Sequence, residues 1–258
     1  MVWMSPNMEM QTHGGGLGRM FSKMFSGESM FQNIYTAHGA GMIAFGSSFP
    51  GQIKEIAITP GHDMILQKSA FLAAVPGVEL SIHFNQRLGA GLFGGEGFIM
   101  QRLSGSGMAF AEIDGTLVEY DLQPGQQIVV DTGNVAGFTA GVQMEIRQVP
   151  GMKNKLLGGE GLFNLSLMGQ GTVALESPVP ASEIVTVDLE NDELKVDGNF
   201  AIAWTNGLQF TVERSTKTLI GSAASGEGLV NVYRGTGRVL LAPVAANLAN
   251  PNAGSGAV

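Results

Sequence analysis

Apolar and polar residues alternate strictly in four short segments of this chain. The segments are residues 8–12, 78–84, 142–147 and 208–213. A period of two places apolar side chains on one face and polar side chains on the other, which is typical of a half-buried antiparallel strand. Residues 117–122 and 184–189 indicate further strands. The pattern therefore predicts an all-β fold.

One segment has helical spacing instead. Leu17, Met20, Phe21, Met24 and Phe25 lie three or four residues apart, so their side chains would share one face of a helix. We therefore expect one short helical segment near the N-terminus.

A Gly-Glu pair recurs four times, at intervals of 64 to 68 residues. The pairs are Gly27-Glu28, Gly95-Glu96, Gly159-Glu160 and Gly226-Glu227, and the Gly-X-Gly turns that follow them are Gly39/Gly41, Gly105/Gly107, Gly169/Gly171 and Gly235/Gly237. Such spacing indicates tandem copies of one supersecondary structure. We expect a single repeat domain over residues 1–246, with units of about 1–66, 67–130, 131–196 and 197–244. Residues 247–258 are expected to form a flexible tail.

Several of these motifs together resemble a known family. The order Gly-Glu-Gly-Leu-Phe and then Gly-X-Gly, with Gln-Lys-Ser-Ala-Phe-Leu-Ala at 67–73 and Val-Asp-Thr-Gly at 130–133, is similar to the altered-inheritance-of-mitochondria family. The resemblance covers nearly the whole chain. It implies tandem units of the double-stranded β-helix class, like the tryptophan RNA-binding attenuation protein (TRAP-like), with pseudo-rotational symmetry.

The resemblance also has functional implications. In the eukaryotic branch of the family, it implies association with the mitochondrial inner membrane and support of its organisation. The family has no enzymatic activity to carry over. Its members have three units and this chain has four Gly-Glu boxes, so three-fold and four-fold symmetry both stay open.

The composition limits which cellular locations and which binding partners are expected for this protein. The chain has 258 residues and no cysteine, a formal net charge of −8 and a pI of about 5.0. That acidity argues against nucleic acid as a partner. Low charge content, 14%, and a mean hydropathy of +0.17 favour mutually covered surfaces, as in a homo-oligomer. The chain has neither a long apolar run nor the pattern of a signal peptide, so we expect a cytoplasmic protein, in part peripheral to the membrane.

Metal-dependent chemistry is an alternative suggested by the β-helix class. His13, His38, His62 and His83 are far apart in the sequence, and none has a second ligand at metal-binding spacing. The four recurring glutamates could form a ring that binds a hard cation. The favoured interpretation is that each Glu accepts backbone N–H groups at its turn. We therefore expect no enzymatic activity, no cofactor and no metal.

The loops before the Gly-Glu boxes combine cations with large apolar residues. The residues concerned are Arg19, Met20, Phe21, Lys23, Met24, Phe25, Arg87, Leu92, Phe93, Lys153, Lys155, Leu156, Leu157, Lys217, Leu219 and Ile220. This composition is typical of surfaces that meet anionic lipid. It predicts a non-enzymatic scaffold, or a membrane-peripheral organising protein, whose partner is an anionic membrane or a protein. In the alternatives, these side chains pack on other loops or subunits, or the protein is a TRAP-like binder of nucleic acid or small ligands.

Overall fold

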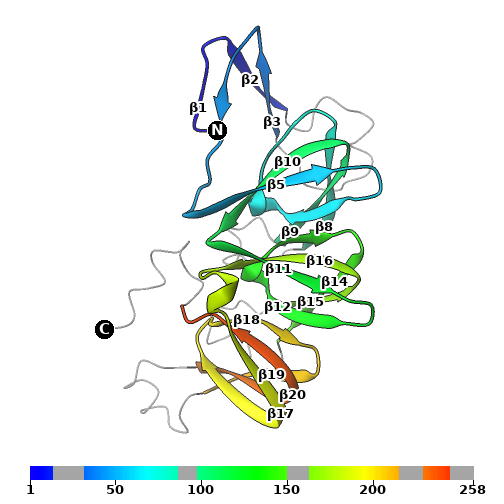
Figure 1. The fold of residues 1–258 in the computed structure, drawn as a ribbon, viewed down its shortest axis with the longest axis vertical. Helices are drawn as coiled ribbons and strands as arrows, with labels where there is room; N and C mark the ends of the chain where they lie inside the picture. Colours follow the sequence, from blue (N-terminus) through cyan, green and yellow to red (C-terminus); the bar gives the residue numbers. More distant parts are fainter. Residues whose placement is uncertain (14–31, 87–97, 150–162, 215–228, 245–258) are drawn as a thin grey trace, which may run out of the picture. The chain divides into compact units, whose positions relative to one another are not determined.

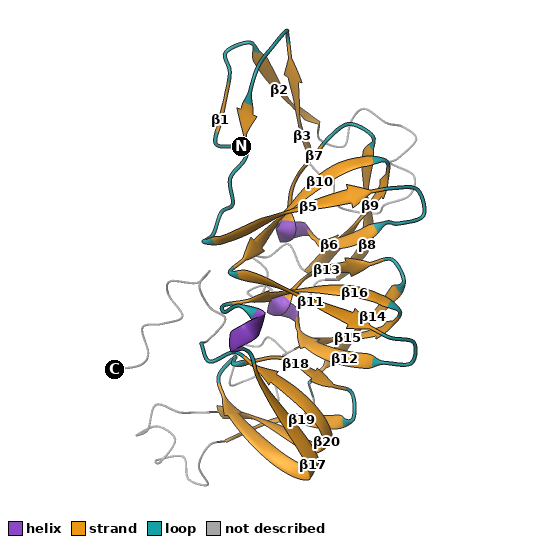
Figure 2. Cartoon of the chain, in the orientation of Figure 1, coloured by secondary structure: helices purple, strands orange, loops and turns teal. Residues whose placement is uncertain are grey.

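The structure is a computed structural model, and it describes residues 1–13, 32–86, 98–149, 163–214 and 229–244. Contacts divide the chain into two compact units, Met1–Gly46 and Ser47–Val258. Nearly all of the regular structure is antiparallel β, which confirms the all-β prediction (Figures 1 and 2). The predicted helical segment, with Leu17 and Phe25 at its ends, lies outside the described residues, as do the predicted tail residues 247–258.

Two short antiparallel pairs form the described part of the first compact unit. They are β1 (Trp3–Met4) with β4 (Ile43–Ala44), and β2 (Met8–His13) with β3 (Gln32–Ala37). Tyr35 and Phe45 meet edge to face with ring centroids 5.5 Å apart. None of the described residues of this unit is fully buried.

Three sheets form the described part of the second compact unit. Its strands are β5 (Gly51–Ile58), β6 (Met64–Gln67), β7 (Phe71–Ala74), β8 (Val78–Gln86), β9 (Phe98–Gly105), β10 (Gly107–Asp114), β11 (Thr116–Leu122), β12 (Gln127–Asp131), β13 (Val135–Thr139), β14 (Val142–Gln148), β15 (Phe163–Gly169), β16 (Gly171–Ser177), β17 (Val185–Asp197), β18 (Ala201–Thr205), β19 (Leu208–Arg214) and β20 (Leu229–Leu241). Three 3-10 turns lie between them, at Lys68–Ala70, Thr132–Asn134 and Ala181–Glu183. The sheet orders are β5-β10-β7, then β11-β16-β13-β6-β9-β8, and then β14-β15-β12-β18-β20-β17, in which β19 also pairs with β20.

The predicted alternation appears directly as burial. In β14, Val142 is buried and Met144 and Ile146 are half-buried, whereas Glu145 and Arg147 are exposed. The four segments that alternate in the sequence are β2, β8, β14 and β19, each the first strand of an antiparallel hairpin. We call β2–β3, β8–β9, β14–β15 and β19–β20 the first to fourth hairpin repeats.

The four hairpin repeats start in one pairing register, which shifts in the second repeat between Ile82 and Phe84. The residue pairs at the ends opposite to the connecting loops are Met8 with Ala37, Val78 with Gly105, Val142 with Gly169, and Leu208 with Gly235. The first repeat corrects part of the predicted motif, because Ala37 and not Gly39 takes the place of the first glycine of the turn. His38 N–H donates to the Asn7 carbonyl, as Ser106 N–H does to Gly77, and two extra residues precede Gly41.

Successive repeats of the second unit are joined by equivalent strand pairs. Strand β13 pairs with β6, and β18 pairs with β12 in the same register. Leu66 faces Gly137 and Ile65 faces Phe138, while Val130 faces Ala203 and Val129 faces Trp204. Positions can therefore be compared from one junction between repeats to the next.

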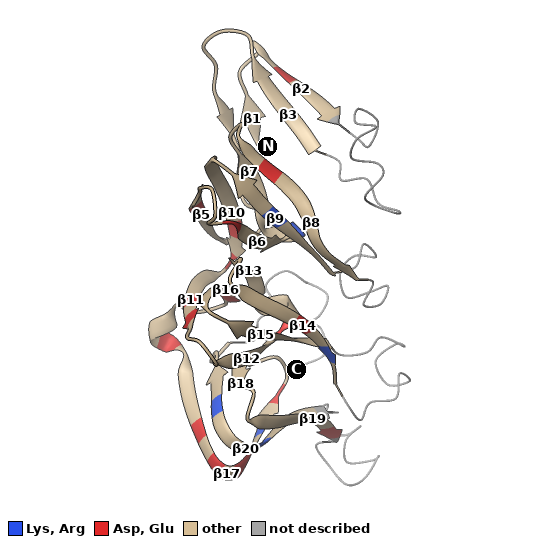
Figure 3. Ribbon diagram, turned by 90° about the vertical axis from the view of Figure 1, so that its right-hand side faces the viewer, with Lys and Arg blue, Asp and Glu red and all other residues tan. Residues whose placement is uncertain are grey.

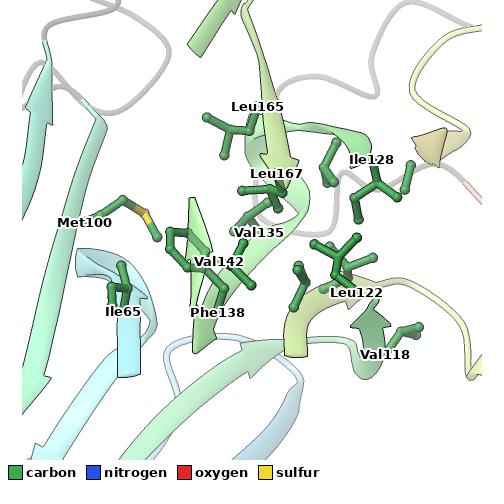
Figure 4. Close-up of a cluster of buried hydrophobic side chains, with 14 of the residues drawn as sticks. Ile65, Met100, Val118, Leu122, Ile128, Val135, Phe138, Val142, Leu165 and Leu167 are labelled. Atoms are coloured by element: carbon green, nitrogen blue, oxygen red, sulfur yellow. The ribbon is translucent and has the colours of Figure 1, made fainter. Parts of the chain in front are cut away.

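The largest core cluster lies between the sheet that contains β13 and the sheet that contains β12. It includes Ile65, Phe138 and Leu167, all within 1% of complete burial, and Val118 and Leu122 at its edge (Figure 4). A second cluster, around Leu66 and Ile113, is rich in alanine. A third contains Trp204, Phe210 and Tyr233, whose rings lie 5.0 to 5.2 Å apart.

Candidate functional site

The predicted contact loops and all four Gly-Glu boxes lie outside the described residues. They fall in residues 14–31, 87–97, 150–162 and 215–228. What the structure describes is the pair of strand ends to which each loop is attached. These pairs are His13 with Gln32, Gln86 with Phe98, Gln148 with Phe163, and Arg214 with Leu229.

The hairpins of the second compact unit share a direction. Strands β8, β14 and β19 run toward the same side of that unit, to the right in Figure 3. Their loop-bearing ends, Gln86, Gln148 and Arg214, therefore lie on one side of the sheets. The loops themselves lie outside the described residues, so the structure shows only the common direction of the strands that lead into them.

The histidines do not gather in the described part of the chain. His38 Nε2 lies 3.2 Å from Glu9 Oε2 in an exposed pair. His83 lies at a register shift between Ile82 and Phe84, and its ring centroid is 6.4 Å from that of Phe138. Among the described residues, no three His, Cys, Asp or Glu side chains are placed to hold a metal ion.

Three carboxylates meet where β10 and β16 end. Glu176 Oε1 accepts the Asp114 backbone N–H at 3.1 Å, and Glu112 Oε2 accepts the Ser48 N–H at 2.7 Å. Burial raises the pKa of Glu176 to about 7, and the nearby charges of Asp114 and Glu112 add to the increase. Burial also raises the pKa of Asp114, whose Oδ1 is enclosed without a hydrogen-bond partner in the described structure. This site is therefore sensitive to pH near neutrality.

An apolar cavity of about 270 Å³ lies between the second and third repeats. Its floor is formed by buried residues of β6, β10, β13 and β16, namely Leu66, Ala111, Ile113, Ala136 and Ala174. Its rim is formed by Lys54, Glu55, Ile56, Ala57, Met64, Leu117, Glu119, Thr139 and Thr172. At the rim, Lys54 Nζ lies 3.2 Å from Glu119 Oε1, and both side chains are about half exposed.

The sequence interpretation did not identify this cavity. Its floor comes from four strands that are separated in the chain, and an alanine in a strand does not by itself indicate a cavity. The alanines stand out only when the repeats are aligned by register, because larger residues occupy the equivalent positions at the next junction. The cavity could hold a small apolar ligand, since pockets of this kind combine an apolar lining with a few polar groups.

The antiparallel hairpins and sheets of the described residues make this chain an all-β protein. The family model described as mitochondrial biogenesis AIM24 matches residues 1–178 and 155–244. The chain therefore belongs to the AIM24 family, as its motifs suggested.

Two streptococcal proteins are similar to it. The uncharacterized protein M6_Spy0233 of Streptococcus pyogenes serotype M6 is 29% identical over 188 residues, covering 69% of this chain and 73% of that protein. The crystal structure of protein SPYM3_0169 from Streptococcus pyogenes superposes with a TM-score of 0.58 at 20% identity, over 78% of this chain and 93% of that one. This second likeness concerns the fold alone.

Proposed function

We propose that this protein is a non-enzymatic scaffold that attaches to an anionic membrane surface through the loops of its hairpin repeats. The observation that carries the proposal is the common direction of the loop-bearing strand ends in the second compact unit (Figure 3). The loops attached there contain Lys153, Lys155 and Lys217 beside Leu156, Leu157, Leu219 and Ile220. Cations next to apolar side chains suit the boundary between head groups and acyl chains.

Peripheral attachment is the form of membrane association that we propose. Within the described residues, no helix is long and apolar enough to cross a membrane. Each Lys or Arg close to an anionic surface contributes about 1 kcal/mol, so several loops acting together would hold a protein of net charge −8 on the membrane. A cytoplasmic location and a homo-oligomer, which would multiply these contacts, belong to the same proposal.

The shared register of the four hairpins supports a finer description of the fold. We propose tandem TRAP-like units of the double-stranded β-helix class, since each repeat contributes its hairpin and the strands β13 and β18 join neighbours in one register. A scaffold of this kind needs no reaction centre. Its function would come from the spacing at which it presents equivalent loops.

Removal of three loop lysines should nearly abolish membrane binding. We expect the variant K153Q/K155Q/K217Q to bind phosphatidylserine vesicles about 100-fold more weakly than the wild type at low salt, since about 3 kcal/mol is lost. Flotation with phosphatidylserine and with phosphatidylcholine vesicles, at low and at high salt, measures this directly.

The matched control removes three lysines from the described strands and turns. The variant K54Q/K68Q/K195Q changes the net charge by the same amount and should keep its binding, because these residues lie outside the loops. Equal loss in both variants would mean that net charge alone governs attachment. Absence of the wild type from the anionic vesicles at low salt would contradict a membrane function.

A further inference from the structure

The cavity between the second and third repeats can be compared with the equivalent junction between the third and fourth repeats. The shared register fixes which positions correspond. Ala111 pairs with Lys54 as Leu175 pairs with Val118. Ala174 pairs with Glu119 as Leu240 pairs with Thr186. By the same alignment, Ala136 of β13 corresponds to Ile202 of β18.

Large side chains fill the second junction. Leu175 and Ile202 are 0% exposed, and Leu240 packs against the same clusters as they do. At the first junction all three positions are alanine, and the cavity of about 270 Å³ lies against them. The hollow therefore reflects the choice of residues at three positions, because the backbone pairing is the same at both junctions.

The rim differs between the two junctions in a second way. Lys54 takes the position of Val118, and Glu119 takes that of Thr186, so an ion pair is placed at the mouth of an apolar hollow. Glu55 and Ala57 also line the cavity, and strand alternation places their side chains on the face of β5 opposite to Lys54 and Ile56. Among the described residues, Lys54 is the one cation that lines the cavity. Its ammonium group has three donors, enough for Glu119 and one further acceptor.

An unfilled apolar cavity lowers the stability of a protein. This cavity is lined by alanine at three positions whose equivalents at the other junction hold leucine or isoleucine. We propose that the cavity binds a small amphipathic carboxylate, with its alkyl chain against Ala111, Ala136 and Ala174 and its carboxylate at Lys54. The volume is near the lower limit for ligand pockets, which restricts the chain to about eight carbons. This site is independent of membrane attachment by the loops.

Octanoate is the probe, and octan-1-ol tests the role of its head group. We expect calorimetry to show octanoate binding to the whole wild-type chain. The variant A111L/A136I/A174L copies the residues of the second junction and should bind at least about tenfold more weakly, because its side chains occupy the cavity. Its melting temperature should equal or exceed that of the wild type. If it does not fold, the single variant A174L replaces it.

The variant K54Q separates the head group from the chain. It should weaken octanoate binding about tenfold and leave octan-1-ol binding unchanged, since only the carboxylate uses the ammonium charge. Failure of the wild type to bind octanoate at millimolar concentration would overturn the site, as would equal binding by a folded filled variant. Equal octanoate binding by wild type and K54Q would overturn the assignment of the head group.

Discussion

Replacement of Glu176 by glutamine is expected to stabilise the protein at pH 8. The wild type should lose stability between pH 4.5 and 7 as this carboxyl ionises, and the variant should lack that part of the loss. The folded pKa of Glu176 is about 7, above the ordinary value of 4.5. Below 4.5 the group is protonated in both the folded and the unfolded state and costs nothing. Above 7 the folded protein must hold a charge on this half-buried carboxyl, so the free energy of unfolding falls as the pH rises from 4.5 to 7.

The size of the effect follows from the shift. A difference of about 2.5 pKa units corresponds to about 3 kcal/mol. Urea unfolding of wild type and E176Q at several pH values from 4 to 8 measures it. Asp114 also has a raised pKa and adds a decline of the same sign, so the quantity of interest is the difference between the two proteins.

Glu145 provides the control for removal of one negative charge. It lies on the exposed face of β14, so E145Q should leave the pH profile close to that of the wild type. Glutamine at 176 can still accept the Asp114 N–H, which preserves the hydrogen bond. Parallel pH profiles of wild type and E176Q would mean that Glu176 is hydrated and ionises normally in the folded protein.

The fold could be predicted as far as its local periodicity allows. The alternation in Val142, Met144 and Ile146 identifies β14 and its buried face without knowledge of its partner. The sequence of β15 also alternates, as Phe163-Asn164-Leu165-Ser166-Leu167, but its polar residues Asn164 and Ser166 are buried together with the leucines. The alternation in a sequence therefore does not show by itself whether the polar face of a strand is exposed.

The candidate sites show where sequence reasoning ends. The carboxylate site depends on Asp114 and Glu176, which are far apart in the chain and meet only because β10 and β16 end together. The cavity depends on which repeat position holds alanine, and that comparison needs the register. The first repeat shows the same limit, because Gly39 matches the motif by spacing whereas Ala37 occupies the position.

Replacement of Gly169 by alanine is expected to cost about 3 kcal/mol or more of folding stability. Gly169 has φ of +115°, which L side chains rarely adopt, and an added Cβ would lie 2.6 Å from the Gly141 carbonyl oxygen. That carbonyl accepts the Gln170 N–H, so it cannot move without loss of the turn that joins β15 to β16. Backbone strain and the clash therefore add.

Gly125 separates these two contributions. It also has a positive φ, +84°, but an added Cβ would meet nothing within 4 Å, so G125A should cost only the backbone strain, about 1 to 2 kcal/mol. Chemical denaturation measures the loss in free energy of unfolding for each variant. The difference between the two losses is the cost of the contact between the added Cβ at position 169 and the Gly141 carbonyl oxygen. In the first repeat, Ala37 tolerates the equivalent position because residues 38–40 replace a single turn residue and Asn7 Nδ2 donates to the Ala40 carbonyl at 2.8 Å. If G169A proved as stable as G125A, the prediction would be wrong, and the turn at Gly169 would have to rearrange to accommodate the added Cβ.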